Sequence, residues 1–205
     1  GQTAINLSQG LDVAGMPILG SSASTIDQAS DRGRFEDLAA EVGIPLPPGG
    51  TAITAEDALQ IADNIGYPVL VRPSYVLGGR AMEIIQNASE LVRYFSNLLA
   101  IGATPGQAIL VDRYLEGIEV EVDAVCDGEN ILIPGIMQHI ERAGVHSGDS
   151  MAVYPALSMT EAEVDTVVDF THRIGVALGI RGLMNIQFVI TGGGAYRSLS
   201  ESGPG

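Results

Sequence analysis

The sequence predicts an α+β fold, in which helices are interleaved with hairpins and strands, and three observations lead to this class. Thr54 and Asp57 have the spacing of a helix N-cap pair and precede an apolar stripe of helical period. Residues 119–125 alternate between carboxylates and apolar side chains, as a strand does. Residues 68–85 form two apolar runs around a turn containing glycine, which predicts a β-hairpin.

In chain order, the first part of the sequence predicts three helices, over residues 4–13, 31–42 and 54–65, each followed within two residues by a glycine that can end it. Residues 16–19 predict a short strand. Residues 44–50, which read IPLPPGG, have the composition of a linker.

The remaining chain begins with the hairpin, whose strands are expected at 68–71 and 80–85. Asn87 then caps a predicted helix whose buried face carries Leu91, Phe95 and Leu98. The later elements are expected to be strands at 108–111, 119–125, 130–140 and 183–190, together with a long helix that Thr160 and Glu163 open and that ends near Gly179.

Two of these features allow a functional or an ordinary interpretation. Glu119, Glu121 and Asp123 share one strand face, which indicates either a metal or sugar-hydroxyl site or a solvated outer face. Arg72 ends the first hairpin strand, where a planar cation could bind an anion beside the glycine-containing turn, or the hairpin could be an ordinary one.

Composition excludes several classes of function. The net charge of −15 argues against a nucleic-acid or anionic-membrane surface. The sequence contains no lysine, which excludes a P-loop and a lysine Schiff base, so a phosphate site would need arginine and backbone N–H groups. Its single cysteine, Cys126, lacks a partner for an internal disulfide, and no signal peptide or apolar run of about 20 residues occurs, so we expect a cytoplasmic protein.

The hairpin sequence PVLVRPSYVLGGRAMEI resembles the ATP-grasp region in the C-terminal half of carbamoyl-phosphate synthase large chains. Four further stretches agree in the same order: GQTAINL (1–7), DRGRF (31–35), AGVHSGDS (143–150) and GLMNIQF (182–188). This resemblance extends to about Ile190. It implies an ATP-grasp fold, in which two α+β subdomains grip ATP. The implied domains are the end of a preceding domain at 1–22, a linker helix with the small subdomain at 23–114, and the large subdomain at 115–205.

The resemblance also implies a reaction, namely phosphorylation of carbamate by ATP to give carbamoyl phosphate, with Mg²⁺ or Mn²⁺ as the metal. Such enzymes serve arginine and pyrimidine biosynthesis and work with a glutamine-hydrolysing small subunit. Two alternatives remain open: another ATP-grasp carboxylate ligase of the biotin carboxylase kind, and a nucleotide-binding module that does not turn over.

The ATP contacts implied by the resemblance are spread over the chain. Arg32, which spacing alone would make a surface helix residue, becomes a nucleotide contact. Glu119 would accept hydrogen bonds from the ribose hydroxyls, and Gln187 would bind both metal and nucleotide. The other implied contacts are Arg72 with Gly78 and Gly79 at the phosphates, Arg113 and Leu115 at the adenine, and the loop Gly144, Val145, His146 and Ser147. His139 and His172 are interpreted as structural, and no catalytic residue is assigned.

The resemblance fails at the C-terminal end. About twelve residues after GLMNIQF the family carries a Glu-x-Asn-Pro-Arg segment with two metal ligands, whereas this chain has a stretch rich in Gly and Ser. An ungapped count places Leu199 and Glu201 at the ligand positions, and we assign no metal role to Glu201. We therefore expect a fragment that is truncated or altered after about residue 190 and inactive by itself.

Overall fold

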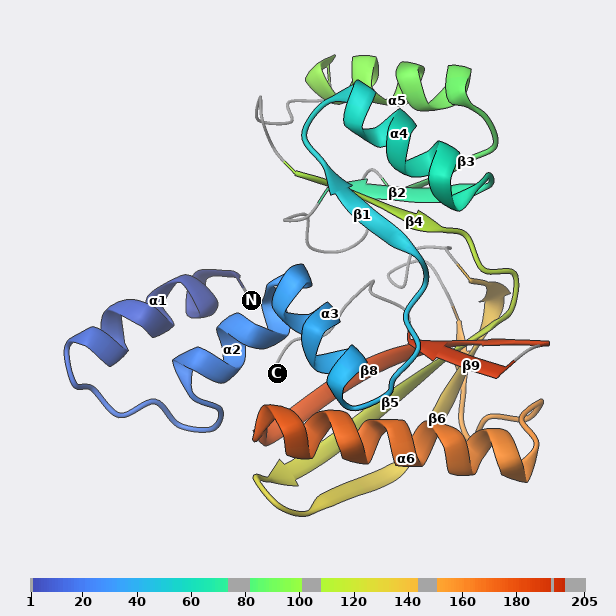
Figure 1. The fold of residues 1–205 in the computed structure, drawn as a ribbon. Helices are drawn as coiled ribbons and strands as arrows, with labels where there is room; N and C mark the ends of the chain where they lie inside the picture. The colour runs from blue at the N-terminus through green and yellow to red at the C-terminus, as the bar shows by residue number, and fades with distance from the viewer. Residues whose placement is uncertain (1, 74–81, 101–107, 144–150, 193, 198–205) are drawn as a thin grey trace. The chain divides into compact units, whose positions relative to one another are not determined.

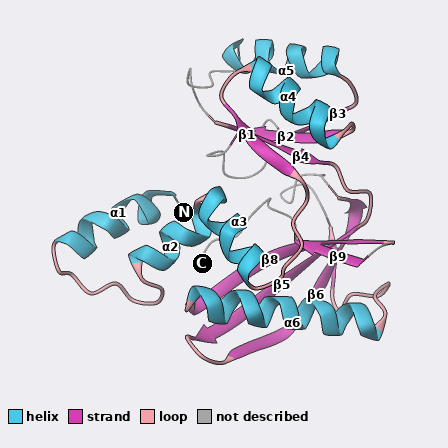
Figure 2. Cartoon of the chain, in the orientation of Figure 1, coloured by secondary structure: helices cyan, strands magenta, loops and turns pink. Residues whose placement is uncertain are grey.

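A computed structural model describes residues 2–73, 82–100, 108–143, 151–192 and 194–197, and its elements are shown in Figures 1 and 2. The chain divides into two compact units. Unit 1 comprises Gly1–Leu46, Gly117–Ile140 and Ala152–Gly205, and unit 2 comprises Pro47–Glu116 and Glu141–Met151. Both units mix helices with antiparallel strands, so the predicted α+β class is confirmed.

Unit 2 is a four-stranded sheet with two helices on one face, as Figure 1 shows. The strand order is β1-β4-β2-β3. The strands are β1 (Gly49–Ala52), β2 (Val69–Pro73), β3 (Glu83–Ile85) and β4 (Ile109–Arg113), and the helices are α4 (Ala55–Ile65) and α5 (Ala88–Ala100).

Local signals account for both helices. Thr54 and Asp57 form a capping box at the start of α4, and Gly66 ends the helix with a φ of 79°. At α5 the backbone N–H of Glu90 donates to Asn87 Oδ1 at 3.1 Å, and Leu91 is fully buried. Both predicted helices are confirmed.

The predicted hairpin is also confirmed, since β2 and β3 pair antiparallel with Val69 opposite Ile85. The residues that join the two strands, 74–81, lie outside the described part of the chain. Strand β1 was not predicted, because its sequence GGTA carries no apolar alternation. A Cβ on Gly50 would lie 3.0 Å from the side chain of Ile61, so the small residue allows α4 to pack close to β1.

Unit 1 is built on a five-stranded sheet of order β7-β6-β5-β8-β9. The strands are β5 (Ile118–Asp127), β6 (Ile131–Arg142), β7 (Ala152–Val153), β8 (Arg181–Thr191) and β9 (Gly194–Arg197). Helix α6 (Glu161–Leu178) lies along one face of this sheet (Figure 1). Its capping box at Thr160 and its left-handed C-cap at Gly179, with a φ of 60°, are those expected from the sequence.

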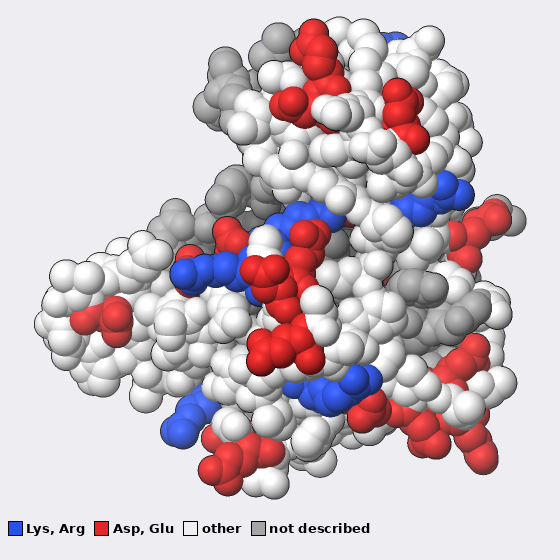
Figure 3. Space-filling model, viewed as in Figure 1, with Lys and Arg blue, Asp and Glu red and all other residues white. Residues whose placement is uncertain are grey.

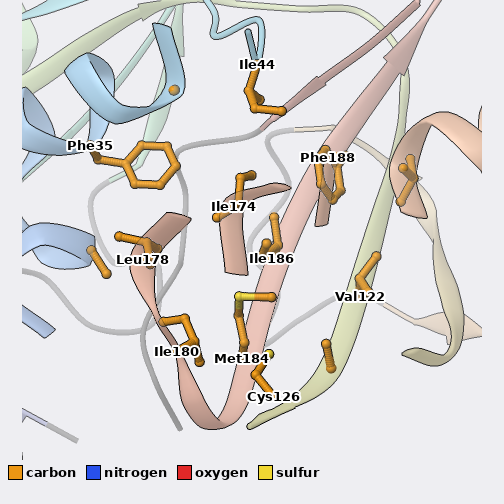
Figure 4. Close-up of a cluster of buried hydrophobic side chains, with 14 of the residues drawn as sticks. Phe35, Ile44, Val122, Cys126, Ile174, Leu178, Ile180, Met184, Ile186 and Phe188 are labelled. Atoms are coloured by element: carbon orange, nitrogen blue, oxygen red, sulfur yellow. The ribbon is translucent and has the colours of Figure 1, made fainter. Parts of the chain in front are cut away.

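The core of unit 1 lies between α6, α3 and the inner face of the sheet, and Figure 4 is a close-up of its buried side chains. Phe188 of β8 is fully buried and its ring centroid lies 6.4 Å from that of Phe170. Cys126 also belongs to this core, and burial raises the pKa of its thiol. A buried, protonated thiol is consistent with the structural role expected for this residue.

Three helices precede the sheet: α1 (Gln2–Val13), α2 (Ala23–Ser30) and α3 (Arg32–Glu41). Helices α1 and α3 were predicted, but α2 was not, because its buried residues Ala23, Thr25 and Ala29 are small and leave a weak apolar stripe. The strand expected at residues 16–19 is wrong. These residues are irregular, Leu19 is 98% exposed, and they pair with no strand of either described sheet.

The C-terminal stretch forms more regular structure than its composition indicates. Although Gly and Ser dominate after Ile190, β9 pairs antiparallel with β8, placing Gly194 opposite Thr191. As an edge strand, β9 needs only one hydrogen-bonded partner, and backbone pairing does not require apolar side chains there. Residues 198–205, including Leu199 and Glu201, lie outside the described part of the chain.

Candidate functional site

The face of the unit 1 sheet that lies opposite the core carries the polar residues that the sequence singled out. Val120, Val122 and Ala124 of β5 point into the core, so the alternate residues point the other way. The antiparallel register with β8 places further polar residues on the same face. We call this set, completed by His139 of β6, the polar face: Glu119, Glu121, Asp123, His139, Asn185 and Gln187.

Burial changes along the polar face. Glu119 is only 5% exposed and Gln187 only 2%, whereas Asp123 is exposed. A carboxylate loses hydration when it is buried, so Glu119 is not the solvated residue that an ordinary outer face would carry. The interpretation of residues 119–125 as a solvated face therefore holds for Asp123 and is wrong for Glu119.

A hydrogen-bond network occupies the middle of the polar face. Asn185 Nδ2 donates to Glu121 Oε1 at 2.6 Å and to Asp123 Oδ1 at 2.7 Å. The second oxygen of Glu121 lies 3.1 Å from Nε2 of His139, which is 4% exposed. The network joins three strands and engages both oxygens of Glu121, so its side chain is held in one orientation.

Sequence reasoning missed two members of this network. Asn185 and His139 lie 46 residues apart in sequence, and only the register of β8 against β5 brings Asn185 to the carboxylates. The one available signal was the position of Asn185, two residues before Gln187 on a predicted strand, which places both on the same face.

Arg32 is the first residue of α3 in unit 1. Its Nε lies 2.5 Å from Glu36 Oε1, an ion pair across one helical turn, and its side chain is 11% exposed. The Arg32 side chain is therefore buried rather than on the surface, contrary to what spacing alone indicates. Its role as a nucleotide contact stays a prediction.

Unit 2 carries the other described residues of the predicted site. Arg72 alternates on β2 with the buried Val71, so it lies on the sheet face opposite α4 and α5. Arg113 ends β4, and its Nη1 donates to the carbonyl oxygen of Ile65 at 2.6 Å. Leu115 follows β4 and is partly buried. The predicted contacts Gly78, Gly79 and 144–147 lie outside the described residues.

Acidic side chains prevail on the molecular face drawn in Figure 3. Even so, among the residues that the structure describes, no group of three or more His, Cys, Asp or Glu side chains could hold a metal ion. Within the same part of the chain, no helix is long and apolar enough to cross a membrane.

The chain matches known proteins in sequence. Residues 31–199 match the family model described as carbamoyl-phosphate synthase L chain, ATP binding domain. The carbamoyl phosphate synthase large chain of Thermomicrobium roseum is 57% identical over 196 residues, which are 96% of this chain and 18% of that protein. The family match continues to residue 199, beyond the point near Ile190 where the resemblance was expected to end. The expectation that the chain is altered after about residue 190 stays a prediction.

Solved structures show the fold. The biotin carboxylase of Campylobacter jejuni superposes with a TM-score of 0.79 at 21% identity, covering 98% of this chain and 46% of that one. A second neighbour is the biotin carboxylase domain of a Hydrogenobacter thermophilus 2-oxoglutarate carboxylase, which was solved with MgADP and bicarbonate. It superposes with a TM-score of 0.79 at 23% identity, covering 98% of this chain and 45% of that one. The D-alanyl-alanine synthetase A of Vibrio cholerae superposes with a TM-score of 0.76 at 16% identity, covering 97% of this chain and 62% of that one.

These neighbours have the ATP-grasp fold, so the fold expected from the sequence is confirmed. Sequence identity to the Thermomicrobium roseum relative is far higher than to the structural neighbours, and that match covers most of this chain. The chain nevertheless spans less than a fifth of the length of that relative. The chain belongs to the carbamoyl-phosphate synthase large-chain family and carries its ATP-binding domain.

Proposed function

We propose that this chain binds ATP with a divalent metal ion and serves the phosphorylation of carbamate to carbamoyl phosphate. The observation that carries the proposal is the polar face. There, on the adjacent strands β5 and β8, Glu119 and Gln187 are both buried. A buried acceptor pair on a rigid sheet is suited to binding a ligand with hydroxyl groups and a metal.

The chemistry of these two residues fits the ligands that the family implies. An ionised carboxylate only accepts hydrogen bonds, so Glu119 suits the two donor hydroxyls of a ribose. The amide oxygen of Gln187 is a neutral ligand of the hard type that Mg²⁺ and Mn²⁺ accept. When bound, the metal ion would neutralise charge on the phosphate oxygens of ATP.

In unit 2, Arg72 is the residue that we expect to bind phosphate. A chain without lysine depends on guanidinium and backbone N–H groups for this purpose, and guanidinium forms bidentate contacts with phosphate oxygens. Gly78 and Gly79, the loop 144–147, Arg32, Arg113 and Leu115 keep the nucleotide-binding roles that the resemblance implies.

The wider context follows from the same family membership. The chain would act within a carbamoyl-phosphate synthase, in the cytoplasm, with a glutamine-hydrolysing small subunit supplying ammonia for carbamate. Its product would enter arginine and pyrimidine biosynthesis. Another carboxylate ligase activity and nucleotide binding without turnover are the two alternatives that an experiment has to separate.

The test combines binding with acceptor dependence. A non-hydrolysable ATP analogue should bind in calorimetry, and ADP should form from MgATP faster with carbamate than with bicarbonate or D-alanine. A faster reaction with either of those acceptors would contradict carbamate as the substrate. Binding of the analogue with no acceptor-dependent ADP would identify a nucleotide-binding module.

A further inference from the structure

The amide of Asn185 is held in one orientation. Its Nδ2 uses both hydrogens, one toward Glu121 Oε1 at 2.6 Å and one toward Asp123 Oδ1 at 2.7 Å. Ionised carboxylates offer no hydrogen to donate, so the amino end of the amide must face them and the carbonyl Oδ1 must face away. Within the described part of the chain, Oδ1 has no hydrogen-bond donor of its own.

The orientation is supported from a third strand. His139 of β6 lies against the other oxygen of Glu121 at 3.1 Å and is 4% exposed. A buried imidazole on a sheet strand has little room to move, so Glu121 is fixed, and Asn185 through it. Asn185 is a partly buried residue, and its Oδ1 is thus an acceptor whose direction is set before any ligand arrives.

The position of Asn185 follows from the strand register. Along the polar face the register runs from the Glu119–Val189 pair to Glu121–Gln187 and then to Asp123–Asn185, each step advancing two residues. Such a step is about 7 Å along a strand. In the proposed function, on which this step rests, the ribose lies at Glu119 and the metal and phosphates lie at Gln187. Asn185 is the next step in the same direction, beyond the transferred phosphoryl group.

We infer that Asn185 is a specificity residue, which accepts a hydrogen bond from the N–H of carbamate through Oδ1. Carbamate has a donor amino end and an anionic carboxylate end. Glu121 and Asp123 repel the anionic end and attract the amino end, so the substrate is oriented with its carboxylate toward the phosphoryl group. A carbamate oxygen then forms a bond to the γ-phosphorus, the bond from that phosphorus to the β–γ bridging oxygen breaks, and ADP leaves.

Two acyl phosphates test this assignment, because carbamoyl phosphate carries an NH₂ group where acetyl phosphate carries a methyl group of similar size. Their affinities are measured by calorimetry at low temperature with saturating ADP and with EDTA, so that binding is seen without phosphoryl transfer. The variant Asn185→Leu has a similar volume and no acceptor. Asn130→Leu is the matched control, because Asn130 also donates to a β5 carboxylate, that of Asp127, but in an exposed turn.

We expect the unsubstituted chain and Asn130→Leu to bind carbamoyl phosphate about three- to tenfold more tightly than acetyl phosphate, which is the effect of one well-placed hydrogen bond. Asn185→Leu should bring this ratio close to one while leaving the affinity for ADP unchanged. The isosteric double variant Glu121→Gln with Asp123→Asn is a second test, which applies even if Asn185→Leu does not fold. It lets the Asn185 amide present either end, and should lower the ratio severalfold.

The outcomes are distinguishable. A ratio near one in the unsubstituted chain, or a ratio that survives both Asn185→Leu and the double variant, overturns the inference and leaves nucleotide binding intact. Equal losses for both acyl phosphates in Asn185→Leu would indicate a structural residue and also overturn it. Failure of ADP to bind even with Mg²⁺ present, measured without an acyl phosphate, would overturn the proposed function and the inference together.

Discussion

Arg113 Nη1 donates a hydrogen bond to the carbonyl oxygen of Ile65, 2.6 Å away, at the C-terminal end of helix α4. The guanidinium satisfies a carbonyl that the helix leaves without an intrahelical donor, and its charge is favourable at the negative end of the helix dipole. Gly66 makes room for it, because a Cβ there would lie 2.6 Å from Nη1 and the residue has a φ of 79°. The contact therefore gives Arg113 a structural task in unit 2.

Arg113→Ala should destabilise unit 2 by about 1–3 kcal/mol, through the lost charge-assisted bond and the lost dipole interaction. The measurement is urea unfolding with hydrogen exchange at α4 as the readout. Arg34→Ala is the control, since its ion pair with Asp27 is exposed and should change stability by less than about 1 kcal/mol. Equal unfolding midpoints for the two variants would contradict the structural role.

Arg72→Ala should weaken the affinity for a non-hydrolysable ATP analogue about ten- to a hundredfold, because it removes a charge-assisted contact worth roughly 1.5–3 kcal/mol. Inorganic triphosphate should lose affinity by a similar factor, since the contact is to phosphate. Arg93→Ala, on the exposed side of α5, carries the same loss of charge away from the sheet and serves as the control. An Arg72→Ala affinity equal to that of Arg93→Ala would exclude Arg72 from the site.

Glu119→Ala should weaken ATP binding more than triphosphate binding, because triphosphate has no ribose for the carboxylate to accept from. Calorimetry with both ligands measures the difference. Glu129→Ala, in the exposed turn after β5, is the control and should leave both affinities unchanged. Equal losses for the two ligands in Glu119→Ala would point to general destabilisation of the buried position rather than to ribose recognition.

The turn between β5 and β6 predicts a pH dependence in acid. Asp127 accepts hydrogen bonds from the backbone N–H groups of Asn130 at 2.7 Å and Glu129 at 2.9 Å. These bonds favour the carboxylate and lower the pKa of Asp127 from 3.8 to about 2. A lowered folded-state pKa means that the stability contributed by this carboxylate is complete above about pH 4 and is lost as the pH falls toward 2.

Unfolding of the unsubstituted chain and of Asp127→Asn should therefore differ most near pH 5 and converge as the pH approaches 2, while an NMR titration of the Asp127 carboxyl reports its pKa directly. A carboxyl titrating near its ordinary value would refute the turn geometry, as would a difference in stability that is independent of pH over this range.

Local signals explain what the sequence predicts well. A cap such as Thr160 and a stop such as Gly179 act within one turn of helix, so α4, α5 and α6 could be placed from short stretches. The ATP-grasp fold came from five ordered motifs rather than from periodicity. The strand expected at residues 16–19 failed because a strand needs a partner, and no local pattern reports whether one is present.

The polar face was predictable only in part for the same reason. Alternation placed Glu119, Glu121 and Asp123 on one face, but it does not determine how deeply each carboxylate is buried. That depends on β6 and β8, and the Asn185 amide reaches Glu121 across 64 residues of chain. Long-range register is thus the information that this network required and that the local sequence does not contain.

Gly117 shows how closely β5 and β8 approach beside the polar face. A Cβ on Gly117 would lie 2.3 Å from the carbonyl oxygen of Ile190 and 2.8 Å from Cγ1 of Val189. Because the first of these atoms is backbone, it can move only if β8 moves with it. Gly117→Ala should therefore push apart the two strands that carry Glu119 and Gln187.

We expect Gly117→Ala to lower the free energy of unfolding by about 1–3 kcal/mol, the usual cost of forcing an extra carbon into a packed region, and to weaken ATP binding as well.

Gly33→Ala is the matched control. A Cβ on Gly33, in helix α3, would meet only Asp31 Oδ1 at an ordinary 3.5 Å. Alanine also has the higher helix propensity and restricts the unfolded chain, so Gly33→Ala should raise stability by about 0.4–1 kcal/mol. A loss of stability in Gly117→Ala together with a gain in Gly33→Ala would show that the backbone contact at Ile190, and not the loss of glycine as such, causes the destabilisation. A Gly117→Ala chain as stable as the unsubstituted one would mean that β5 and β8 do not approach so closely.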